Sequence, residues 1–470
     1  MFLARLLVLF SLVCISCAHS SFEQKQLKHA LDFATSNRLE LEILLQHYTY
    51  DSLKLEAAKF LIRNMPHCYS YQQGSEMDSV KRVRTYYSPF GQIDQTYARR
   101  WGHYTYRNLP KIYDAHIITA EYLIDNIDRA FDNWQKRPWN RSLSFEDFCE
   151  YLLPYRIGDE PLEEWRELYE KKYGYLLDSI YKGSDVVEAA NLVSRHLQEP
   201  VFIYCEDFEL PHIGPRYLFS HRYGSCVDAA DIVTYAFRAV GIPCMEDTDA
   251  RGGHVWNVVR DTTGRDVPIW YIASEAVRGS RDTGGYKRGK VYRPMYGFQE
   301  AKAAHLGDDW KSMPLLFYHP YMKDVSYAYY PDTLRILTGI PDDEVCYLAH
   351  FHEAHWWSCA CARSASGKME IPNLESELVY LPMKYTKGNY YPSGFPFWFA
   401  GGEINTFLPD WEKTVKVRLY RKYPVYGWLR SFMSHVVGGT FEGSMTKNFE
   451  DGKTLYEIAD TPVIARNRIF

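Results

Sequence analysis

The fold of this chain is decided by one stretch near its middle, Arg222-Tyr-Gly-Ser-Cys226-Val-Asp-Ala-Ala-Asp-Ile-Val-Thr-Tyr-Ala-Phe-Arg-Ala-Val-Gly-Ile-Pro243. Apolar residues recur within it at intervals of three and four positions, at Ala230, Val233, Phe237 and Val240. This spacing predicts an amphipathic helix over residues 226–240. Gly241 suits the position that follows the last helical residue, and Pro243 prevents the helix from continuing.

Cys226 falls in the first turn of this predicted helix. Ser225 precedes it and is a residue type that caps helix starts. The N–H groups of a first turn have no partners within the helix, and the helix dipole is positive there, so both favour a thiolate. The same N–H groups can stabilise an oxyanion formed on an attacked carbonyl. The position indicates a thiol nucleophile, with an inert buried cysteine as the alternative.

A candidate base follows on a predicted β-hairpin over residues 253–274. With the turn centred on 263–264, His254 faces Ala273; with the turn centred on 264–265, it faces Glu275. Of these two, only Glu275 can accept a hydrogen bond from an imidazole. We therefore expect a catalytic triad of Cys226, His254 and Glu275.

Three segments resemble the transglutaminase-like superfamily in order and spacing: Gly224-Ser-Cys226-Val-Asp228, Arg238-Ala-Val-Gly-Ile-Pro243 and Gly253-His254-Val-Trp256. The resemblance implies an α+β, papain-type core that needs no cofactor. It also implies thiol chemistry on an amide carbonyl, either hydrolysis of a peptide bond or acyl transfer to an amine. The usual third residue of that family is an aspartate. The segment Trp270-Tyr-Ile-Ala-Ser274-Glu275 offers none, so Glu275 is the expected substitute, while Asp261 and Asp266 are expected at the wrong end of the hairpin.

Two neighbours of the predicted pair each have two candidate roles. Asp228 suits a first-turn carboxylate that interacts with the helix dipole, and it is also a candidate substrate contact. Side chains alternate along a strand, so Trp256 shares a face with His254. We expect Trp256 to pack in the core, with substrate binding as the alternative.

The regions that flank the predicted core differ in pattern. Residues 18–200 are mainly helical, with a capping box expected at Asn37-Arg-Leu-Glu40 and an N-cap at Ser144. The core is expected over 201–300, a β-sandwich over 318–430 and the start of a second β-rich domain over 431–470. This order resembles the multidomain transglutaminase-like lipoproteins of Bacteroidetes. In that group the last domain is similar to a discoidin-type, galactose-binding-like fold, of which this chain matches only the opening strands.

Residues 1–17 predict a signal peptide. A short basic start at Arg5 precedes an apolar run that is too short to span a bilayer. The run closes on Cys14-Ile-Ser-Cys17, which resembles a bacterial lipobox except that Cys14 stands where Leu is usual. The resemblance implies lipidation of Cys17 and anchoring to the outer membrane in the cell envelope, with plain secretion as the alternative.

Composition and spacing argue against other classes of protein. The net charge is -5 and no long basic run occurs, which argues against nucleic-acid binding. The ten cysteines include no CxxC pair, and nothing in their spacing demands disulfides. His350-Phe-His352-Glu-Ala-His355 is not an HExxH motif, and on a single strand His355 would lie opposite the other two, so no metal site is expected.

Two functions remain as hypotheses. The first is an exported, cysteine-dependent amide-bond hydrolase or acyl transferase acting on peptides, proteins or glycopeptides. The second is a catalytically degenerate surface lipoprotein that binds glycan or protein. They differ in whether the Cys226 thiol is unusually reactive.

Overall fold

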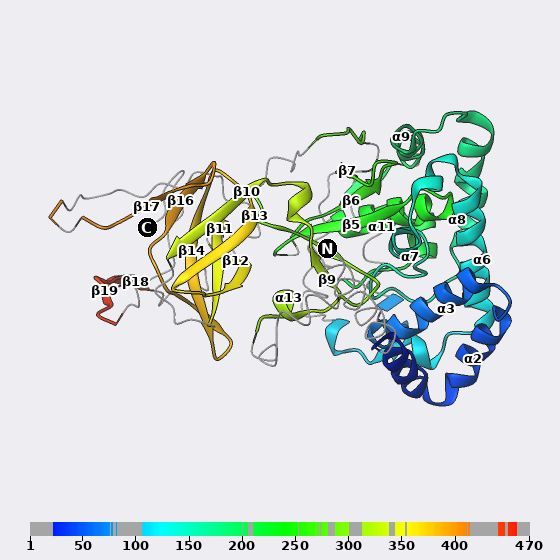
Figure 1. Ribbon diagram of the computed structural model, residues 1–470, viewed down its shortest axis with the longest axis horizontal. Coiled ribbons are helices and arrows are strands. Elements are labelled where there is room, and N and C mark those ends of the chain that lie inside the picture. The colour runs from blue at the N-terminus through cyan, green and yellow to red at the C-terminus, as the bar shows by residue number, and fades with distance from the viewer. Residues whose placement is uncertain are drawn as a thin grey trace, which may run out of the picture. The chain divides into compact units, whose positions relative to one another are not determined.

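The computed structural model describes residues 22–75, 77–78, 81, 106–199, 201–204, 210–251, 253–270, 272, 274–280, 287–299, 313–337, 344–352, 355–410, 412–413, 440–446 and 450–457. The fold is of the mixed α+β class, as the sequence predicts (Figure 1). The chain divides into two compact units. The first comprises residues 1–286, 291–308 and 318–329, and the second comprises 287–290, 309–317 and 330–470.

The N-terminal part of the first unit is helical, with α2 (Arg38–His47), α3 (Ser52–Asn64), α6 (Ala120–Lys136) and α7 (Phe145–Tyr151). Ser144 caps α7 by accepting a hydrogen bond from the Asp147 N–H at 3.0 Å, which confirms that prediction. The capping box expected at Asn37 and Glu40 is wrong. Their side chains reach to a distant segment instead, where the Asn37 amide donates to the Ile118 carbonyl and Glu40 accepts from the Ala120 N–H.

Three further helices surround the predicted central helix, which forms as α11 (Cys226–Ala239). They are α8 (Arg166–Tyr175), α9 (Val186–His196) and α10 (Pro215–Ser220), and one buried apolar cluster joins α8, α9 and α11. Gly241 follows α11 with φ +82°, a conformation that favours glycine. A Cβ there would lie 2.9 Å from the Asn133 carbonyl oxygen. Both observations confirm the predicted helix end.

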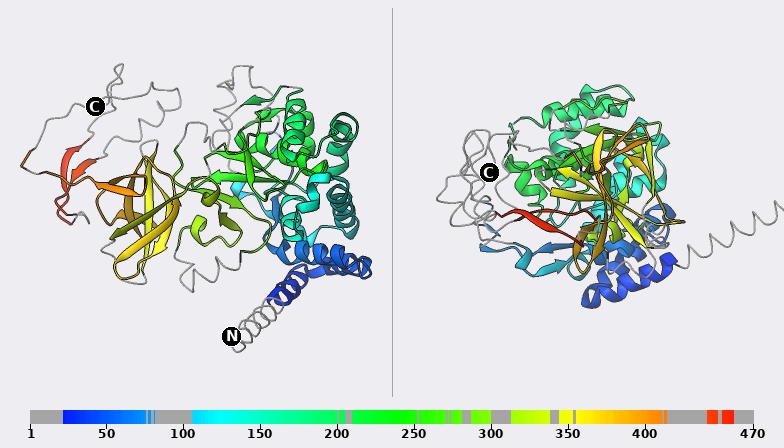
Figure 2. Two further views of the ribbon diagram at one scale, coloured as in Figure 1. Left: turned by 45° about the horizontal axis from the view of Figure 1, so that its top comes forward. Right: turned by 90° about the vertical axis from the view of Figure 1, so that its left-hand side faces the viewer.

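An antiparallel sheet of five strands lies against α11 in the order β7-β6-β5-β8-β9 (Figures 1 and 2). The strands are β5 (Cys244–Asp249), β6 (Val255–Arg260), β7 (Asp266–Ile269), β8 (Val291–Pro294) and β9 (Met322–Asp324). The predicted hairpin is present as β6 and β7, although β7 is shorter than expected. Because β9 pairs with β8, the sheet extends past the boundaries of 300 and 318 that the sequence suggested.

The second unit is built mainly of strands. A two-stranded sheet pairs β10 (Asp332–Leu337) with β13 (Lys368–Leu374). A six-stranded antiparallel sheet contains β11 (Val345–His352), β12 (His355–Arg363), β14 (Leu378–Thr386), β15 (Asn389–Pro392), β16 (Phe397–Ala400) and β17 (Glu403–Thr406). A separate hairpin joins β18 (Thr440–Gly443) to β19 (Lys453–Glu457). Residues 414–439, which span the end of the expected β-sandwich and the start of the second β-rich domain, lie outside the described residues.

A hairpin carries His350, His352 and His355, because residues 352 and 355 pair directly across β11 and β12. Their side chains therefore share a face, which corrects the expectation that His355 lies on the other side. His350 is fully buried. Within the described ranges, no group of three or more His, Cys, Asp or Glu side chains could hold a metal ion.

Candidate functional site

The start of α11 holds the predicted nucleophile in a defined turn. Cys226 is the first helical residue and is half-buried. The Asp228 carboxylate accepts a hydrogen bond from the Ser225 N–H at 2.8 Å and a second from the Ser225 hydroxyl at 3.2 Å. Gly224 makes room for this carboxylate, because a Cβ at 224 would lie 2.3 Å from its Oδ2. The Gly-Ser-Cys-x-Asp pattern therefore fixes the turn that carries the thiol.

His254 lies at the end of the loop that joins β5 to β6, one residue before the strand. Its carbonyl oxygen accepts hydrogen bonds from the Thr248 hydroxyl at 3.0 Å and from the Asp249 N–H at 3.3 Å. The Asp249 carboxylate accepts from the backbone N–H groups of Arg251 and Gly253. The loop is thus closed on itself around a buried aspartate, and this holds the backbone that carries the imidazole.

Cys226 and His254 both lie beside the same two tryptophans. Cys226 lines a cavity of about 10 Å³ together with Trp256 and Trp270. The His254 ring stacks near Trp256, with centroids 5.8 Å apart, and lies parallel to Trp270 at 6.5 Å with an interplanar angle of 5°. The two residues that the sequence singled out therefore come from a helix start and a strand start to one place in the fold.

The candidate substrate contacts, Asp228 and Trp256, are both buried and bonded within the protein. Asp228 is 2% exposed and closes the first turn of α11. Trp256 is 1% exposed, and its indole N–H donates to the Tyr329 hydroxyl at 2.9 Å. These contacts support the structural role that the sequence gave to each residue rather than direct contact with substrate.

The expectation for Glu275 rested on a hairpin register that is wrong. Arg260 pairs with Asp266 and Asn257 with Ile269, so the turn is centred on Thr263. This register, continued past the strands, sets residue 254 opposite 272 rather than 273 or 275. Glu275 lies beyond β7, is exposed, and forms an ion pair with Arg195 at 3.1 Å. Glu275 is therefore not part of the group formed by Cys226, His254 and the two tryptophans.

The other two carboxylates of the hairpin lie away from the thiol, as expected. Asp261 accepts hydrogen bonds from the Thr263 and Arg265 N–H groups and closes the turn. Asp266 is paired with Arg293 at 2.8 Å. Neither is in a position to orient His254.

A buried ionic network supports the sheet beneath the tryptophans, and the sequence analysis did not identify it. The Arg293 guanidinium pairs with Asp247 and Asp266, and both carboxylates are almost fully buried. The Tyr329 hydroxyl donates to Asp247 at 2.6 Å and accepts from Trp256, so the network ends at the tryptophan beside His254. Burial disfavours the charge of Arg293, but these two carboxylates outweigh that effect and raise its pKa. The three charged groups come from β5, β7 and β8, and no local pattern in the sequence links them.

No disulfide joins any of the seven cysteines in the described part of the chain. Five of these seven are buried, whereas Cys226 and Cys361 are half-buried. Burial raises the pKa of Cys68, Cys149 and Cys244, which makes those thiols poor nucleophiles. Cys14 and Cys17 lie outside the described residues. None of the described helices is long and apolar enough to cross a membrane.

No family model, no curated protein and no solved structure matches the chain.

Proposed function

We propose that the chain is a cysteine-dependent amide-bond hydrolase or acyl transferase with a transglutaminase-like core, acting on peptides, proteins or glycopeptides. The proposal is supported by one observation above the others. A half-buried thiol on the first turn of α11 and an imidazole at the start of β6 lie beside the same pair of tryptophans. A helix start lowers the pKa of a thiol, and an adjacent imidazole accepts its proton.

The reaction follows from these two groups. His254 takes the proton from Cys226, and the thiolate attacks the carbonyl carbon of an amide. The C–N bond breaks, the amine leaves with the proton that His254 returns, and a thioester forms on Cys226. Water or a second amine then attacks the thioester while His254 accepts its proton, which releases the acid or the new amide and restores the thiol. The N–H groups of the first turn can stabilise the oxyanion of both steps.

The cellular setting belongs to the same proposal. The predicted signal peptide and the acylation of Cys17 would place the protein in the cell envelope, in contact with the outer membrane through a lipid rather than a helix. Both features fall on residues outside the described ranges. Treating intact cells with a membrane-impermeant thiol reagent, and labelling them with a radioactive fatty acid, tests them directly.

Thiol reactivity tests the mechanism, and Cys361 provides an internal control because, like Cys226, it is a half-buried cysteine of the described part of the chain. We expect iodoacetamide at about pH 6 to modify Cys226 at least about tenfold faster than Cys361, as quantified by peptide mass spectrometry. His254→Asn should remove most of that difference. Cys226→Ala should abolish the release of soluble label from fluorescein-labelled casein. Equal modification of the two cysteines would contradict the proposal.

A degenerate core that binds its ligand without chemistry is the second candidate. It is favoured by Trp270, whose ring lies parallel to His254. An indole N–H can only donate a hydrogen bond, so Trp270 cannot orient an imidazole in the way a carboxylate does. On this alternative, Cys226 has ordinary reactivity, and Cys226→Ala leaves the capture of glycans or proteins unchanged.

A further inference from the structure

A second cavity of about 390 Å³ opens in the first unit, on a different face of α11 from the thiol. Val227, directly after Cys226, lines it, and so does Val255, directly after His254. Its volume lies at the lower end of the roughly 300–1,000 Å³ of small-molecule sites. It can therefore hold a group about the size of one amino-acid side chain.

One end of this cavity is acidic. Glu246 on β5 is 8% exposed, and its Oε1 accepts a hydrogen bond from the Thr234 hydroxyl at 2.7 Å. Its Oε2 receives no hydrogen bond from the described residues. Asp159 and Glu150 also line the cavity, and among the described residues none of these three carboxylates has a cationic side chain within ion-pair distance. Burial raises the pKa of Glu246, and the charges of His212 and Arg238 oppose that effect without cancelling it.

The cations that line the same cavity are engaged elsewhere. Arg156 pairs with Asp114 and also donates to the Glu160 carbonyl oxygen. Arg238 donates to the carbonyl oxygens of Tyr151 and Cys244, both at 3.2 Å. Within the described ranges neither guanidinium forms an ion pair with Glu246, although the charge of Arg238 acts on that carboxylate and lowers its pKa.

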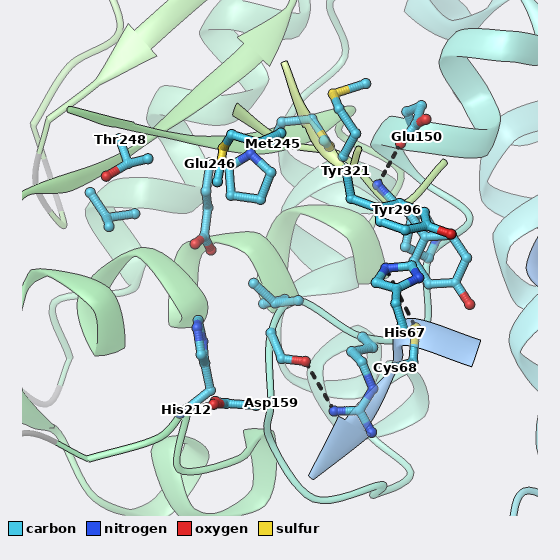
Figure 3. A pocket seen from close by; sticks show the side chains of 18 of the residues that line it. His67, Cys68, Glu150, Asp159, His212, Met245, Glu246, Thr248, Tyr296 and Tyr321 are labelled. Atoms are coloured by element: carbon cyan, nitrogen blue, oxygen red, sulfur yellow. Dashed lines mark hydrogen bonds between the residues drawn. The ribbon is translucent and has the colours of Figure 1, made fainter. Parts of the chain in front are cut away.

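The one imidazole at the acidic end is already neutralised. His212 Nδ1 lies 2.9 Å from the carboxylate of Asp231, which is fully buried on α11. Gly158 packs against the other edge of the ring, where a Cβ would lie 2.3 Å from Nε2. In Figure 3, His212 and Glu246 point towards each other across this end of the cavity. The pair of His212 and Asp231 adds no net charge. The carboxylates of Glu246 and Asp159 outnumber the one unpaired guanidinium among the described lining residues, Arg238, so this end of the cavity stays acidic.

The other end of the cavity is mainly aromatic, and Glu150 lies beside the aromatic rings there in Figure 3. The rings of His67 and Tyr321 stack with centroids 3.5 Å apart, and both lie at this end in Figure 3. Burial lowers the pKa of His67 to about 3, so its imidazole is neutral at physiological pH. Its buried Nδ1 has no hydrogen-bond partner among the described residues. Three methionines, Met245, Met295 and Met322, complete an adaptable apolar wall.

We infer that this cavity is a binding site for an organic cation carried on an apolar stem, of about the size of an arginine side chain. The cation would pair with Glu246, and the stem would lie along the methionines towards His67 and Tyr321. A guanidinium suits the site because it is weakly hydrated and can stack on aromatic rings. The inference does not require the thiol chemistry of Cys226.

Matched ligands test the inference. N-acetyl-arginine amide is titrated into the full chain by calorimetry, beside N-acetyl-citrulline amide, which has the same shape without the charge. We expect the arginine compound to bind at least about tenfold more tightly than the citrulline compound. N-acetyl-glutamate amide should not bind. Equal affinities, no binding of the arginine compound or tighter binding of the glutamate compound would each overturn the inference.

Two variants locate the site. Glu246→Gln keeps the shape of the side chain and should reduce the affinity for the arginine compound to that for the citrulline compound. Met322→Trp fills the apolar end and should weaken the binding of both compounds. Glu403→Gln removes an exposed carboxylate from β17 in the second unit and should change neither affinity. An unchanged arginine affinity in Glu246→Gln would place the ligand elsewhere.

The outcome can be separated from that of the proposed enzyme. The same titrations with Cys226→Ala should give the wild-type affinities, because the cavity and the thiol lie on different faces of α11. Binding with no thiol reactivity would support this site and contradict the enzyme. Thiol reactivity with no binding would do the reverse.

Discussion

Two faces of one helix, α11, carry two different kinds of site. The face that holds Cys226 meets two tryptophans and is tightly packed, with a cavity of only about 10 Å³ beside the thiol. The face that holds Asp231 meets a cavity of about 390 Å³ whose polar end consists of ionisable groups. The first arrangement depends on the geometry of a helix start, and the second on the balance of buried charge. Each can therefore be disturbed without the other, except where they share support.

The shared support is the network around Arg293, and its removal should have the largest effect. Arg293→Met would leave Asp247 buried without a cation, while Asp266 would keep only Arg260 at 3.3 Å. Loss of one partner from a buried ion pair costs about 3–5 kcal/mol. We expect the free energy of unfolding, measured with urea, to fall by about that amount. Both thiol reactivity and cation binding should weaken together.

The control for this prediction is an exposed arginine on the second unit. Arg335 pairs with Glu370 on the surface, so Arg335→Met should cost less than about 1 kcal/mol. A similar loss in both variants would mean that the buried network does not support the sheet.

Two glycines allow each face of α11 to be perturbed without the other. Gly224 makes room for Asp228 on the thiol side, and Gly158 makes room for His212 on the cavity side. An added methyl group at either place forces a charged or polar side chain to move, at a cost of about 1–3 kcal/mol. Gly224→Ala should lower the alkylation rate of Cys226 and spare cation binding, and Gly158→Ala should do the opposite. If both variants affect both measurements equally, the two faces are not independent.

The cavity side should also give the protein a pH-dependent stability. Burial raises the pKa of Glu150 from 4.5 to about 7, so the stability from its protonated form is lost as pH rises between those values. Burial lowers the pKa of His67 from 6.5 to about 3, so the stability from its neutral form is lost as pH falls between those values. Both side chains are half-buried, and each effect should amount to about 1–2 kcal/mol.

Separate variants distinguish these opposite dependences. Glu150→Gln should remove the decline in the free energy of unfolding above pH 4.5, and its amide oxygen can still accept from the Tyr296 and Gly297 N–H groups. His67→Gln should remove the decline below pH 6.5. Urea unfolding at a series of pH values measures both. Profiles that match the wild type in both variants would show that other groups control the pH response.

The two faces of α11 differ in how much of each could be predicted from the sequence, because one depends on local contacts and the other on contacts between distant segments. The thiol site depends on local rules, so apolar spacing, Ser225 and Gly241 were enough to predict α11 and the place of Cys226. Strand alternation was enough to place His254 on the same face of the hairpin as Trp256. The cavity brings together residues from segments around 67, 150–160, 212, 246 and 321, and no local pattern relates them. Thr248 and Asp249 fall between these cases, since a Thr-Asp pair before a Gly-Gly loop is a pattern that could have indicated the turn holding His254.

The hairpin register is the feature that the sequence analysis predicted most clearly wrongly. The variant that tests it, Glu275→Gln, has the smallest expected effect. A shift in the turn centre to Thr263 moves residue 275 away from the position opposite residue 254, and this was enough to suggest the wrong third member of a triad. Glu275→Gln should therefore leave the pH profile of Cys226 alkylation unchanged. It should alter the free energy of unfolding by less than about 0.5 kcal/mol, because it removes only an exposed pair with Arg195. A large loss of Cys226 reactivity in this variant would restore Glu275 as the partner of His254.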